Sequence, residues 1–334
     1  MTPIQKCLIN KNTKINPVWL MRQAGRYLPE FREIRKQNPN FIKLCLNTDL
    51  ASEITLQPIR RFGFDGAVIF SDILMLPYGL GQKVEFEKNF GPKLGDIDLE
   101  TIRDVDEIIF SEKVYKVYKA IEKTSKDPLM SNRDMIGFVG APWTILVYMI
   151  NKSSPKKGLS DDFFKDDFLI NRLLGIIEKF LKLHIKNQIE AGAQVIQIFD
   201  SWAGLLENKI PEYIYIPTLN IVDYVKKLGV PVICFPRGIK ENYKDFNNLV
   251  KPDGINIDSE IDPDWAKDKL KDVVIQGGLD PRTLLKTDDE IFKGATKYIK
   301  AFKDMPYVFN LGHGLLPETD PAKVEKLINF YRSS

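Results

Sequence analysis

Two arginines placed four residues apart are the most chemically suggestive feature of the sequence. Arg22 and Arg26 belong to the run MRQAGRY, and Arg32 and Arg35 follow shortly after. A guanidinium fork donates two parallel hydrogen bonds to a carboxylate, and charge-assisted bonds of this kind contribute roughly 1.5–3 kcal/mol each. Arg32 and Arg35 are equally well explained as exposed helix charges. The spacing of Arg22 and Arg26 predicts a site for a ligand rich in carboxylates.

The charge balance of the whole chain makes such recognition local. The 48 Lys and Arg residues and 45 Asp and Glu residues leave a net charge of +3, which gives no basis for binding nucleic acid or a membrane surface. Cys7, Cys45 and Cys234 are scattered and form no metal-binding pair. The N-terminus lacks an apolar signal segment, and no apolar run could span a bilayer. We expect a cytoplasmic protein without a disulfide framework or a metal site.

Eight short apolar runs have the length and β-branched content of strands buried on both faces. They are Val18–Arg22, Ala67–Ser71, Met135–Gly140, Val195–Asp200, Val230–Phe235, Gly254–Asp258, Val273–Gly278 and Tyr307–Gly312. Helical periodicity fills nearly every gap. One example is the segment from Asp49 to Arg61, where we expect a helix with Thr48 or Asp49 as its N-cap that ends before Gly63.

Strand and helix repeated eight times predict a (β/α)8 TIM barrel, a single domain over residues 1–334 with short insertions. The alternative is an open doubly wound sheet. Such a sheet usually carries a Gly-rich fingerprint after its first strand, and RQAGRY does not supply one. The polar segment from Asn151 to Ser160 follows the third strand, where it is either a lid over the barrel mouth or an ordinary surface loop.

The carboxyl ends of the strands form the active-site face of a (β/α)8 barrel. The chemistry-bearing residues that follow the eight runs are, in order, Arg22, Gln23, Arg26, Asp72, Tyr148, Asp200, Ser201, Arg237, Asp258 and His313. Several have simpler explanations: Asp72 as a helix cap, Tyr148 as a packed aromatic and Ser201 as a turn hydroxyl. We expect Asp258 and Asp280 to be structural caps.

The two histidines have different surroundings in the sequence. His184 shares one apolar helical face with Leu173 and Phe180, so we expect it in the core. His313 lies between two glycines, Gly312 and Gly314, which allow a close approach of backbone to a ligand. A metal hydrolase has little support from one such histidine. A Ser-His-Asp triad would lack the usual GxSxG motif.

Six sequence blocks carry a resemblance to a known family. They are PVWLMRQAGRYLPEFREIR at Pro17, FSDIL at Phe70, GAPWT at Gly140, FDSWAG at Phe199, QGGLDP at Gln276 and NLGHG at Asn310. Together, and in this order, they resemble the uroporphyrinogen decarboxylase family. The resemblance covers essentially the whole chain.

The resemblance implies a homodimeric, cytosolic barrel enzyme that uses no metal or organic cofactor. The reaction it implies removes CO2 from the four acetate side chains of uroporphyrinogen III and gives coproporphyrinogen III in haem biosynthesis. It implies Asp72, Arg22 and Tyr148 as catalytic residues. The implied substrate-binding residues are Arg22, Gln23, Ala24, Gly25, Arg26, Arg35, Asp72, Tyr148, Ser201 and His313.

The types of these residues suit the implied substrate. Its carboxylates match the arginines, Tyr148, Ser201 and His313, and its pyrrole N–H groups match the Asp72 carboxylate. A pyrrole protonated on a ring carbon can take up the electrons left by CO2, and Asp72 would stabilise that cation. Guanidinium is a very weak acid, so we expect Arg22 to position a carboxylate. The proton donor stays open between His313, a substrate carboxylic acid and water.

Two other functions compete with this interpretation. Corrinoid-linked methyltransferases share the barrel but need a His-x-Cys zinc motif, whereas Gly314 and Leu315 follow His313. A tetrapyrrole carrier without catalysis could keep the arginines without needing Asp72. The sequence favours the decarboxylase over both.

Overall fold

A computed structural model describes residues 1–14, 16–87, 91–156, 158–160 and 163–334. Its central feature is a curled sheet of seven parallel strands in the order β1-β4-β5-β6-β7-β8-β9. These strands are β1 (Gly66–Val68), β4 (Asp134–Gly140), β5 (Val195–Asp200), β6 (Val232–Pro236), β7 (Gly254–Ile257), β8 (Val274–Gly277) and β9 (Tyr307–Val308). Each neighbouring pair is parallel, which is the arrangement that alternating strands and helices produce.

The eighth position of the ring is filled by a short bridge. Val18 pairs in parallel with Phe309, whose N–H donates to the Pro17 oxygen at 2.9 Å. On the other side, the N–H of Asp65 donates to the Val18 oxygen at 2.9 Å, next to β1. The segment therefore closes the barrel, and the predicted TIM-barrel fold is confirmed. The predicted strand Val18–Arg22 is wrong in extent, because the chain turns after residue 20 and Arg22 adopts a left-handed φ of 62°.

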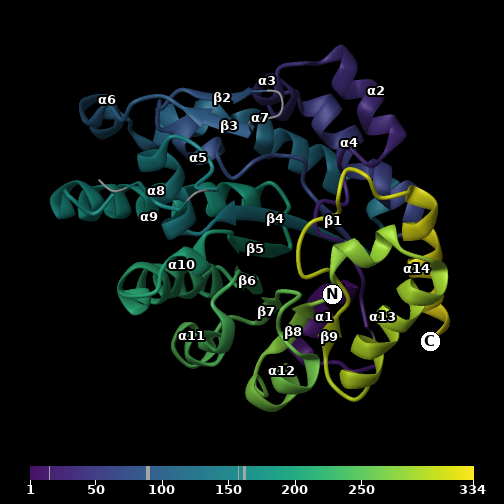
Figure 1. Ribbon diagram of the computed structural model, residues 1–334. Coiled ribbons are helices and arrows are strands. Elements are labelled where there is room, and N and C mark those ends of the chain that lie inside the picture. Colours follow the sequence, from purple (N-terminus) through teal and green to yellow (C-terminus); the bar gives the residue numbers. More distant parts are fainter. Residues whose placement is uncertain (15, 88–90, 157, 161–162) are drawn as a thin grey trace.

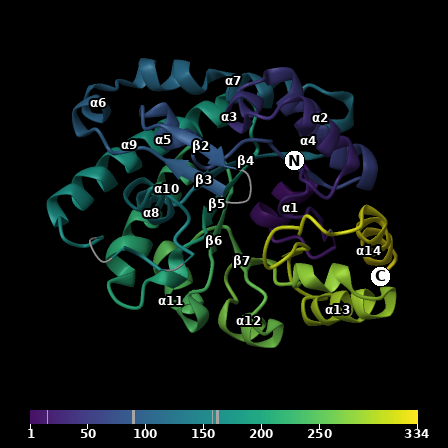
Figure 2. The same ribbon diagram turned by 45° about the horizontal axis from the view of Figure 1, so that its top comes forward.

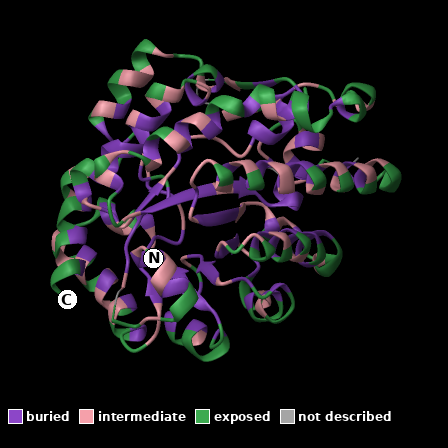
Figure 3. Ribbon diagram, turned by 180° about the vertical axis from the view of Figure 1, so that it is seen from behind, coloured by how far each residue is buried: buried purple, intermediate pink, exposed green. Residues whose placement is uncertain are grey.

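The helices form the outer layer around this ring (Figure 1), and they expose their outer faces while the strands stay buried (Figure 3). They are α1 (Pro3–Asn10), α2 (Pro29–Gln37), α3 (Phe41–Cys45), α4 (Thr48–Phe62), α5 (Met75–Gly79), α6 (Leu99–Asp104), α7 (Glu107–Ser125), α8 (Pro142–Asn151), α9 (Asp167–Glu190), α10 (Ile216–Lys227), α11 (Tyr243–Val250), α12 (Pro263–Lys269), α13 (Asp288–Ala301) and α14 (Pro321–Ser333). Five short helical turns supplement them: η1 (Pro128–Met130), η2 (Ala203–Leu205), η3 (Pro211–Tyr215), η4 (Lys240–Asn242) and η5 (Pro281–Leu285).

Local signals explain two of the long helices. The α4 helix begins at Thr48, and the Asn47 side chain caps it by accepting the N–H of Leu50 at 3.1 Å. The predicted N-cap at Thr48 or Asp49 is therefore wrong, because Asn47 caps the helix and Thr48 and Asp49 lie within it. The helix ends at Phe62, before Gly63 as the sequence predicted, and the φ of 65° at Gly63 suits a glycine C-cap. In α9, His184 lies buried among apolar side chains, as expected, and shares a hydrogen bond with the Tyr118 hydroxyl at 2.8 Å.

The first helix, α1, covers the N-terminal end of the barrel. Its backbone N–H at Ile4 donates to the Asp134 carboxylate at the start of β4, at 2.8 Å, and the Thr2 hydroxyl donates to the same carboxylate. Leu8 packs so closely over Gly254, at the start of β7, that a Cβ there would lie 2.9 Å from its methyl carbon. The sequence had not predicted this helix, which seals one end of the barrel.

An antiparallel hairpin, β2 (Val84–Glu87) and β3 (Gly91–Leu94), follows the first named strand of the ring. It forms a sheet of its own beside α3 and α5 (Figure 2). The sequence had predicted only unspecified short insertions. The segment after α8 runs along this hairpin, because the Leu94 N–H donates to the Lys152 oxygen at 2.7 Å. Residue 157 of the predicted loop lies outside the described residues.

Candidate active site

The inside of the barrel is blocked by a layer of hydrogen-bonded polar side chains. The Gln276 amide donates to Gln197 at 3.0 Å and to Asn256 at 2.9 Å, and its oxygen accepts the Trp19 indole N–H at 2.9 Å. These amides are completely buried. One layer nearer the carboxyl ends, Phe138 and Phe199 are only half-buried and meet edge to face at 5.7 Å. A ligand at this end would meet an aromatic floor above a closed polar plug.

The loop that carries the first two arginines is fixed by hydrogen bonds to both flanking strands. The Met21 N–H donates to the Asn310 side chain at 2.8 Å, and the Leu315 N–H donates to the Met21 oxygen at 2.9 Å. The Gln23 amide donates to the Gly66 oxygen at 3.0 Å and is buried. The protein therefore uses the Gln23 side chain to support this loop, and its predicted contact with substrate stays a prediction.

Arg22 occupies a strained backbone position at the barrel mouth. A φ of 62° is rare for a residue with a side chain, and such strain concentrates at functional sites. Its side chain lies directly across Gly314, where any Cβ would come within 2.2 Å of the Arg22 Cδ. The guanidinium is accessible to solvent, yet burial by surrounding protein is the main cause that lowers its pKa. The Arg22 guanidinium is therefore a cation that solvent can reach but that lies in a recess of the protein.

Asp72 lies close enough to this cation to interact with it. Desolvation raises the pKa of the Asp72 carboxyl to about 6, while a hydrogen bond from the Leu74 N–H at 2.9 Å and the charge of Arg22 act in the opposite direction. The side chain is therefore mostly ionised at neutral pH. Only one of its two oxygens accepts a hydrogen bond within the described part of the chain, so the other can receive a ligand N–H.

Tyr148 and Ser201 approach from the next two strands. The Tyr148 ring packs edge-on against Trp202 at 6.0 Å, and its pKa, raised mainly by burial, also responds to the charges of Asp72 and Arg22. Ser201 stays half-buried. Thr144 fixes the residues on both sides of Ser201.

The Thr144 hydroxyl makes this connection by bonding to two neighbours. It donates to the Asp200 carboxyl at 2.6 Å and accepts the Trp202 N–H at 3.1 Å. Burial raises the pKa of Asp200 to about 7. We assign the Thr144–Asp200 pair to support of the loop. The sequence motifs GAPWT and FDSWAG contained both residues, but their contact required the folded barrel.

His313 is a neutral hydrogen-bond donor in the free protein. Its Nδ1 accepts the Gly314 N–H at 2.6 Å, which leaves the proton on Nε2. Burial, followed by the charges of Arg22 and Arg237, lowers the pKa of His313 to about 4. Very little imidazolium is therefore present at neutral pH, which weakens the case for His313 as the proton donor.

The remaining predicted residues lie at the edge of this group. Arg26 is exposed and its charge acts on Arg22, while Ala24 and Gly25 are half-buried between these two arginines. Arg35, on α2, stacks over the Phe41 ring at 5.6 Å.

Arg35 and Asp72 both lie within electrostatic range of the buried Cys45 thiol. The charges of both Arg35 and Asp72 act on the pKa of Cys45. The structural roles expected of two other aspartates fit their bonding. Asp258 accepts from the Gly238 N–H and the Tyr243 hydroxyl, and Asp280 caps the turn η5.

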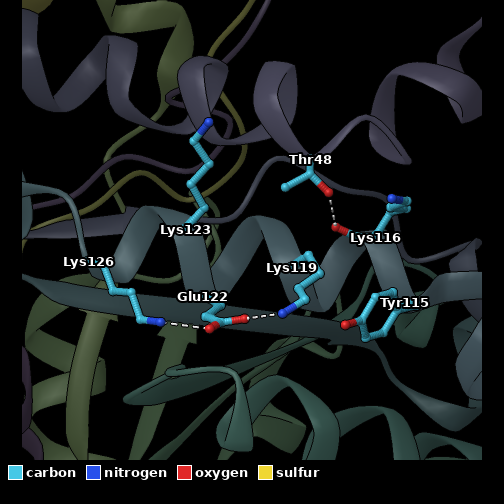
Figure 4. A pocket seen from close by; sticks show the side chains of 7 residues that line it. All are labelled: Thr48, Tyr115, Lys116, Lys119, Glu122, Lys123 and Lys126. Atoms are coloured by element: carbon cyan, nitrogen blue, oxygen red, sulfur yellow. Dashed lines mark hydrogen bonds and ion pairs between the residues drawn. The ribbon is translucent and has the colours of Figure 1, made fainter.

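A second recess, of about 410 Å3, lies outside the barrel on α7 (Figure 4). Its lining residues are Thr48, Tyr115, Lys116, Lys119, Glu122, Lys123 and Lys126. Glu122 pairs with Lys119 at 2.8 Å and with Lys126 at 2.7 Å, and Lys123 pairs with Asp49 at 2.6 Å. These lysines carry protein counter-ions. Among the described residues, no carboxylate forms an ion pair with Arg22 or Arg26.

The fold and these side chains define a class of protein: a (β/α)8-barrel enzyme whose mouth gathers arginine side chains around one carboxylate. Among the described residues, no three His, Cys, Asp or Glu side chains gather as a metal site would require. The family model described as uroporphyrinogen decarboxylase (URO-D) matches residues 1–334. The chain belongs to the uroporphyrinogen decarboxylase family.

Individual relatives agree with this family. A uroporphyrinogen decarboxylase of Rickettsia bellii is 40% identical over 325 residues, covering 95% of this chain and 94% of that protein. One from Rickettsia felis is 38% identical over 329 residues, covering 97% and 95%. Among solved structures, a methyltransferase from Methanosarcina mazei superposes with a TM-score of 0.79 at 14% identity, covering 99% of this chain and 97% of that one. This last likeness concerns the fold alone.

Proposed function

We propose that the barrel mouth carries out the reaction for which the family is named. The four acetate carboxyl groups of uroporphyrinogen III leave as CO2, and coproporphyrinogen III is formed. The chain is a carboxy-lyase of porphyrin biosynthesis, which we place in the haem pathway. The observation that carries the proposal is the proximity of one desolvated carboxylate, Asp72, to a guanidinium, Arg22, that forms no ion pair with any described residue.

The substrate and the mouth are chemically complementary. The macrocycle offers inward-pointing pyrrole N–H groups, and the free oxygen of Asp72 is an acceptor for them. Its peripheral carboxylates suit the cations Arg22 and Arg26, the Tyr148 and Ser201 hydroxyls and the Nε2–H of His313. We propose these residues as the binding site, with Arg35, Gln23, Ala24 and Gly25 completing its rim. The half-buried Phe138 and Phe199 rings would lie beneath the macrocycle.

The chemistry needs no electron acceptor other than the pyrrole. A proton adds to a ring carbon and gives a cation. The bond between the acetate methylene and its carboxylate then breaks, its electron pair moves into the ring, and CO2 departs. Return of a proton to the methylene carbon and loss of the ring proton leave a methyl group. A fixed Asp72 carboxylate in a desolvated site stabilises the cation, and groups of this kind contribute roughly 3–4 kcal/mol.

Three residues have distinct parts in this proposal. Asp72 holds the pyrrole N–H groups, Arg22 holds the departing carboxylate, and Tyr148 donates a hydrogen bond next to both. His313 binds through Nε2–H, since its pKa of about 4 leaves little acid form. A substrate carboxylic acid or water then supplies the proton.

The protein's assembly and location are part of the same proposal. We propose one domain over residues 1–334, a homodimer, and a cytoplasmic location. None of the helices in the described part of the chain is both long and apolar enough to cross a membrane.

The direct test is anaerobic incubation of purified, chelator-treated protein with uroporphyrinogen III. We expect products with seven, six, five and finally four carboxylates, together with four equivalents of CO2. Tight porphyrinogen binding without CO2 release would instead establish a carrier. Loss of activity on chelation, restored by zinc, would point to the methyltransferase type of chemistry.

A further inference from the structure

Arg237 lies at the mouth, next to the proposed site, but none of the roles above uses it. The ladder between β5 and β6 continues one residue beyond the strands, because the Arg237 N–H donates to the Asp200 oxygen at 3.1 Å. Arg237 is therefore the lateral neighbour of Ser201. Its own oxygen accepts the Gly204 N–H at 2.9 Å. The backbone of Arg237 is thus held on two sides.

The strand that precedes Arg237 has its inner face toward the lumen. Gln197 points inward, where it bonds to the Gln276 amide across the barrel. Gln197 is paired with Ile233, and Phe199 with Phe235, so these two residues of β6 lie on the inner face. Arg237 follows directly in a turn, where its N–H also donates to the Phe235 oxygen at 3.0 Å, and so it lies at the carboxyl end of the barrel.

The charge of Arg237 reaches the groups on the opposite side of the mouth. It contributes to lowering the pKa of both Arg22 and His313, which come from the first and last segments of the ring. Within the described residues, the Arg237 side chain forms neither a hydrogen bond nor an ion pair. The neighbouring Asp258 carboxylate is occupied by the Gly238 N–H at 2.8 Å and the Tyr243 hydroxyl at 3.2 Å.

Such an arrangement is unfavourable in the free protein. Arg237 forms no ion pair with the described residues, and its charge acts on a second cation, Arg22, and on the His313 imidazole, so the three groups disfavour further positive charge in the space they share. A bound anion would reverse this effect. Unpaired charge kept at the cost of stability is typical of binding sites.

We propose that Arg237 binds a carboxylate of the substrate, from the wall of the mouth that also carries Ser201. The inference rests on the proposed function for the identity of the ligand, a polycarboxylate porphyrinogen. Arg237 is then a substrate-positioning residue that completes a ring of donors around the macrocycle. Arg22, His313 and Arg237 approach its periphery from three separate segments of the barrel.

The test compares Arg237→Gln and Arg237→Lys with wild type. Loss of one charge-assisted contact predicts a KM for uroporphyrinogen III that is about 10- to 100-fold higher in Arg237→Gln, with a much smaller change in kcat. Arg237→Lys should recover part of that loss. Arg103→Gln, an exposed arginine on α6, is the matched control and should behave as wild type.

Two further measurements separate binding from a structural role. Arg237→Gln should unfold at the same temperature as wild type or higher, because it removes repulsion. It should also raise the pKa of His313 in an NMR titration, where this chain has only two histidine signals. A lowered melting temperature with an unchanged His313 pKa would overturn the proposal, as would an unchanged KM.

A binding measurement keeps this test independent of the reaction. Coproporphyrinogen III is titrated anaerobically into each variant, and tryptophan fluorescence reports binding, since Trp202 packs on Tyr148. If wild type binds but releases no CO2, the proposed function fails while the Arg237 comparison remains measurable. Equal affinities of wild type and Arg237→Gln would overturn the role of Arg237 alone.

Discussion

The two ends of the barrel treat a buried carboxylate in opposite ways. Burial raises the pKa of both Asp134 and Asp72 to about 6. At the closed end, Asp134 accepts hydrogen bonds from the Thr2 hydroxyl and from the N–H groups of Ile4 and Gln5. At the mouth, Asp72 accepts one hydrogen bond from the described residues, that of the Leu74 N–H. The closed end satisfies its polar groups within the protein, whereas the mouth leaves them available to a ligand.

This difference separates stability from function along the barrel axis. Residues at the N-terminal face of such barrels contribute chiefly to stability, and those at the C-terminal face to chemistry. The cations at the mouth follow the same rule, because Arg22 and Arg237 have no ion pairs among the described residues. Substitutions at the two ends should therefore affect different measurements.

The largest effect is expected for Asp72→Asn. Removal of a preorganised charge that faces the reacting pyrrole should lower kcat about 100- to 1000-fold. The free energy of unfolding at pH 7 should not fall, because a carboxyl whose pKa is raised in the folded state destabilises that state once ionised. Anaerobic product assays and urea unfolding measure the two quantities.

The matched control is Asp280→Asn, which removes a helix-cap carboxylate and should keep turnover near normal. Near-normal turnover in Asp72→Asn would remove Asp72 from the mechanism.

Arg22 should show an intermediate effect that distinguishes fork geometry from charge. Arg22→Lys keeps the charge but loses the bidentate fork, so we expect kcat/KM to fall about 10- to 100-fold. Arg22→Ala should lose more. The exposed Arg60, changed to Lys, serves as control. Full activity in Arg22→Lys combined with loss in Arg22→Ala would show that charge alone matters, and full activity in Arg22→Ala would exclude Arg22 from the site.

At the closed end, Asp134→Ala should affect stability alone. It leaves the N-terminal N–H groups of α1 without their acceptor, which typically costs roughly 1–3 kcal/mol. Urea unfolding should detect this loss, while kcat per folded molecule stays unchanged. A drop in kcat without a drop in stability would contradict the separation of the two ends.

The smallest expected effect concerns the two histidines. The pKa of both His184 and His313 is lowered to about 4, from 6.5 in an unfolded chain. The unfolded state therefore takes up protons first as the pH falls, so the stability that these groups contribute above pH 6.5 is lost on acidification. Each histidine should lower the free energy of unfolding by about 1 kcal/mol between pH 7 and pH 5.5.

A bound ligand should change the pKa of one of these histidines and leave that of the other unchanged. Coproporphyrinogen III places carboxylates beside His313 and should raise its pKa, whereas His184 lies within the helix layer and should not respond. NMR titration of the two imidazole signals, with and without ligand, measures this directly. An equal response of both signals would contradict the placement of the ligand at the mouth.

The sequence predicted the ring of strands better than its ends. Val195–Asp200 matches β5 residue for residue, because a strand buried on both faces leaves a run rich in β-branched and other apolar residues. The turn at Arg22 could not be predicted, since a positive φ is expected of glycine rather than arginine. The seal by α1 depends on Asp134, a contact between residues 130 positions apart that no local pattern encodes.

The same holds for the candidate site. Local sequence patterns indicated residues of the site, but their contacts depend on segments that are far apart in the sequence. Residue types at strand ends indicated Arg22, Asp72 and His313 before any contact was known. Their electrostatic coupling required the folded ring, as did the neutral state of His313, which follows from its burial and from the charges of Arg22 and Arg237. Arg237 was visible at a strand end, but its lack of a counter-ion was not.

The pairing that closes the barrel also constrains how the protein is made. Val18 is translated long before its partner Phe309, which lies 291 residues further along the chain. Until Phe309 is available, Val18 cannot bridge β1 and β9. The apolar edges of the open sheet then stay unprotected. Contacts of such long sequence separation slow folding and lengthen the period of exposure. The nascent chain should therefore depend on chaperones until Phe309 has left the ribosome.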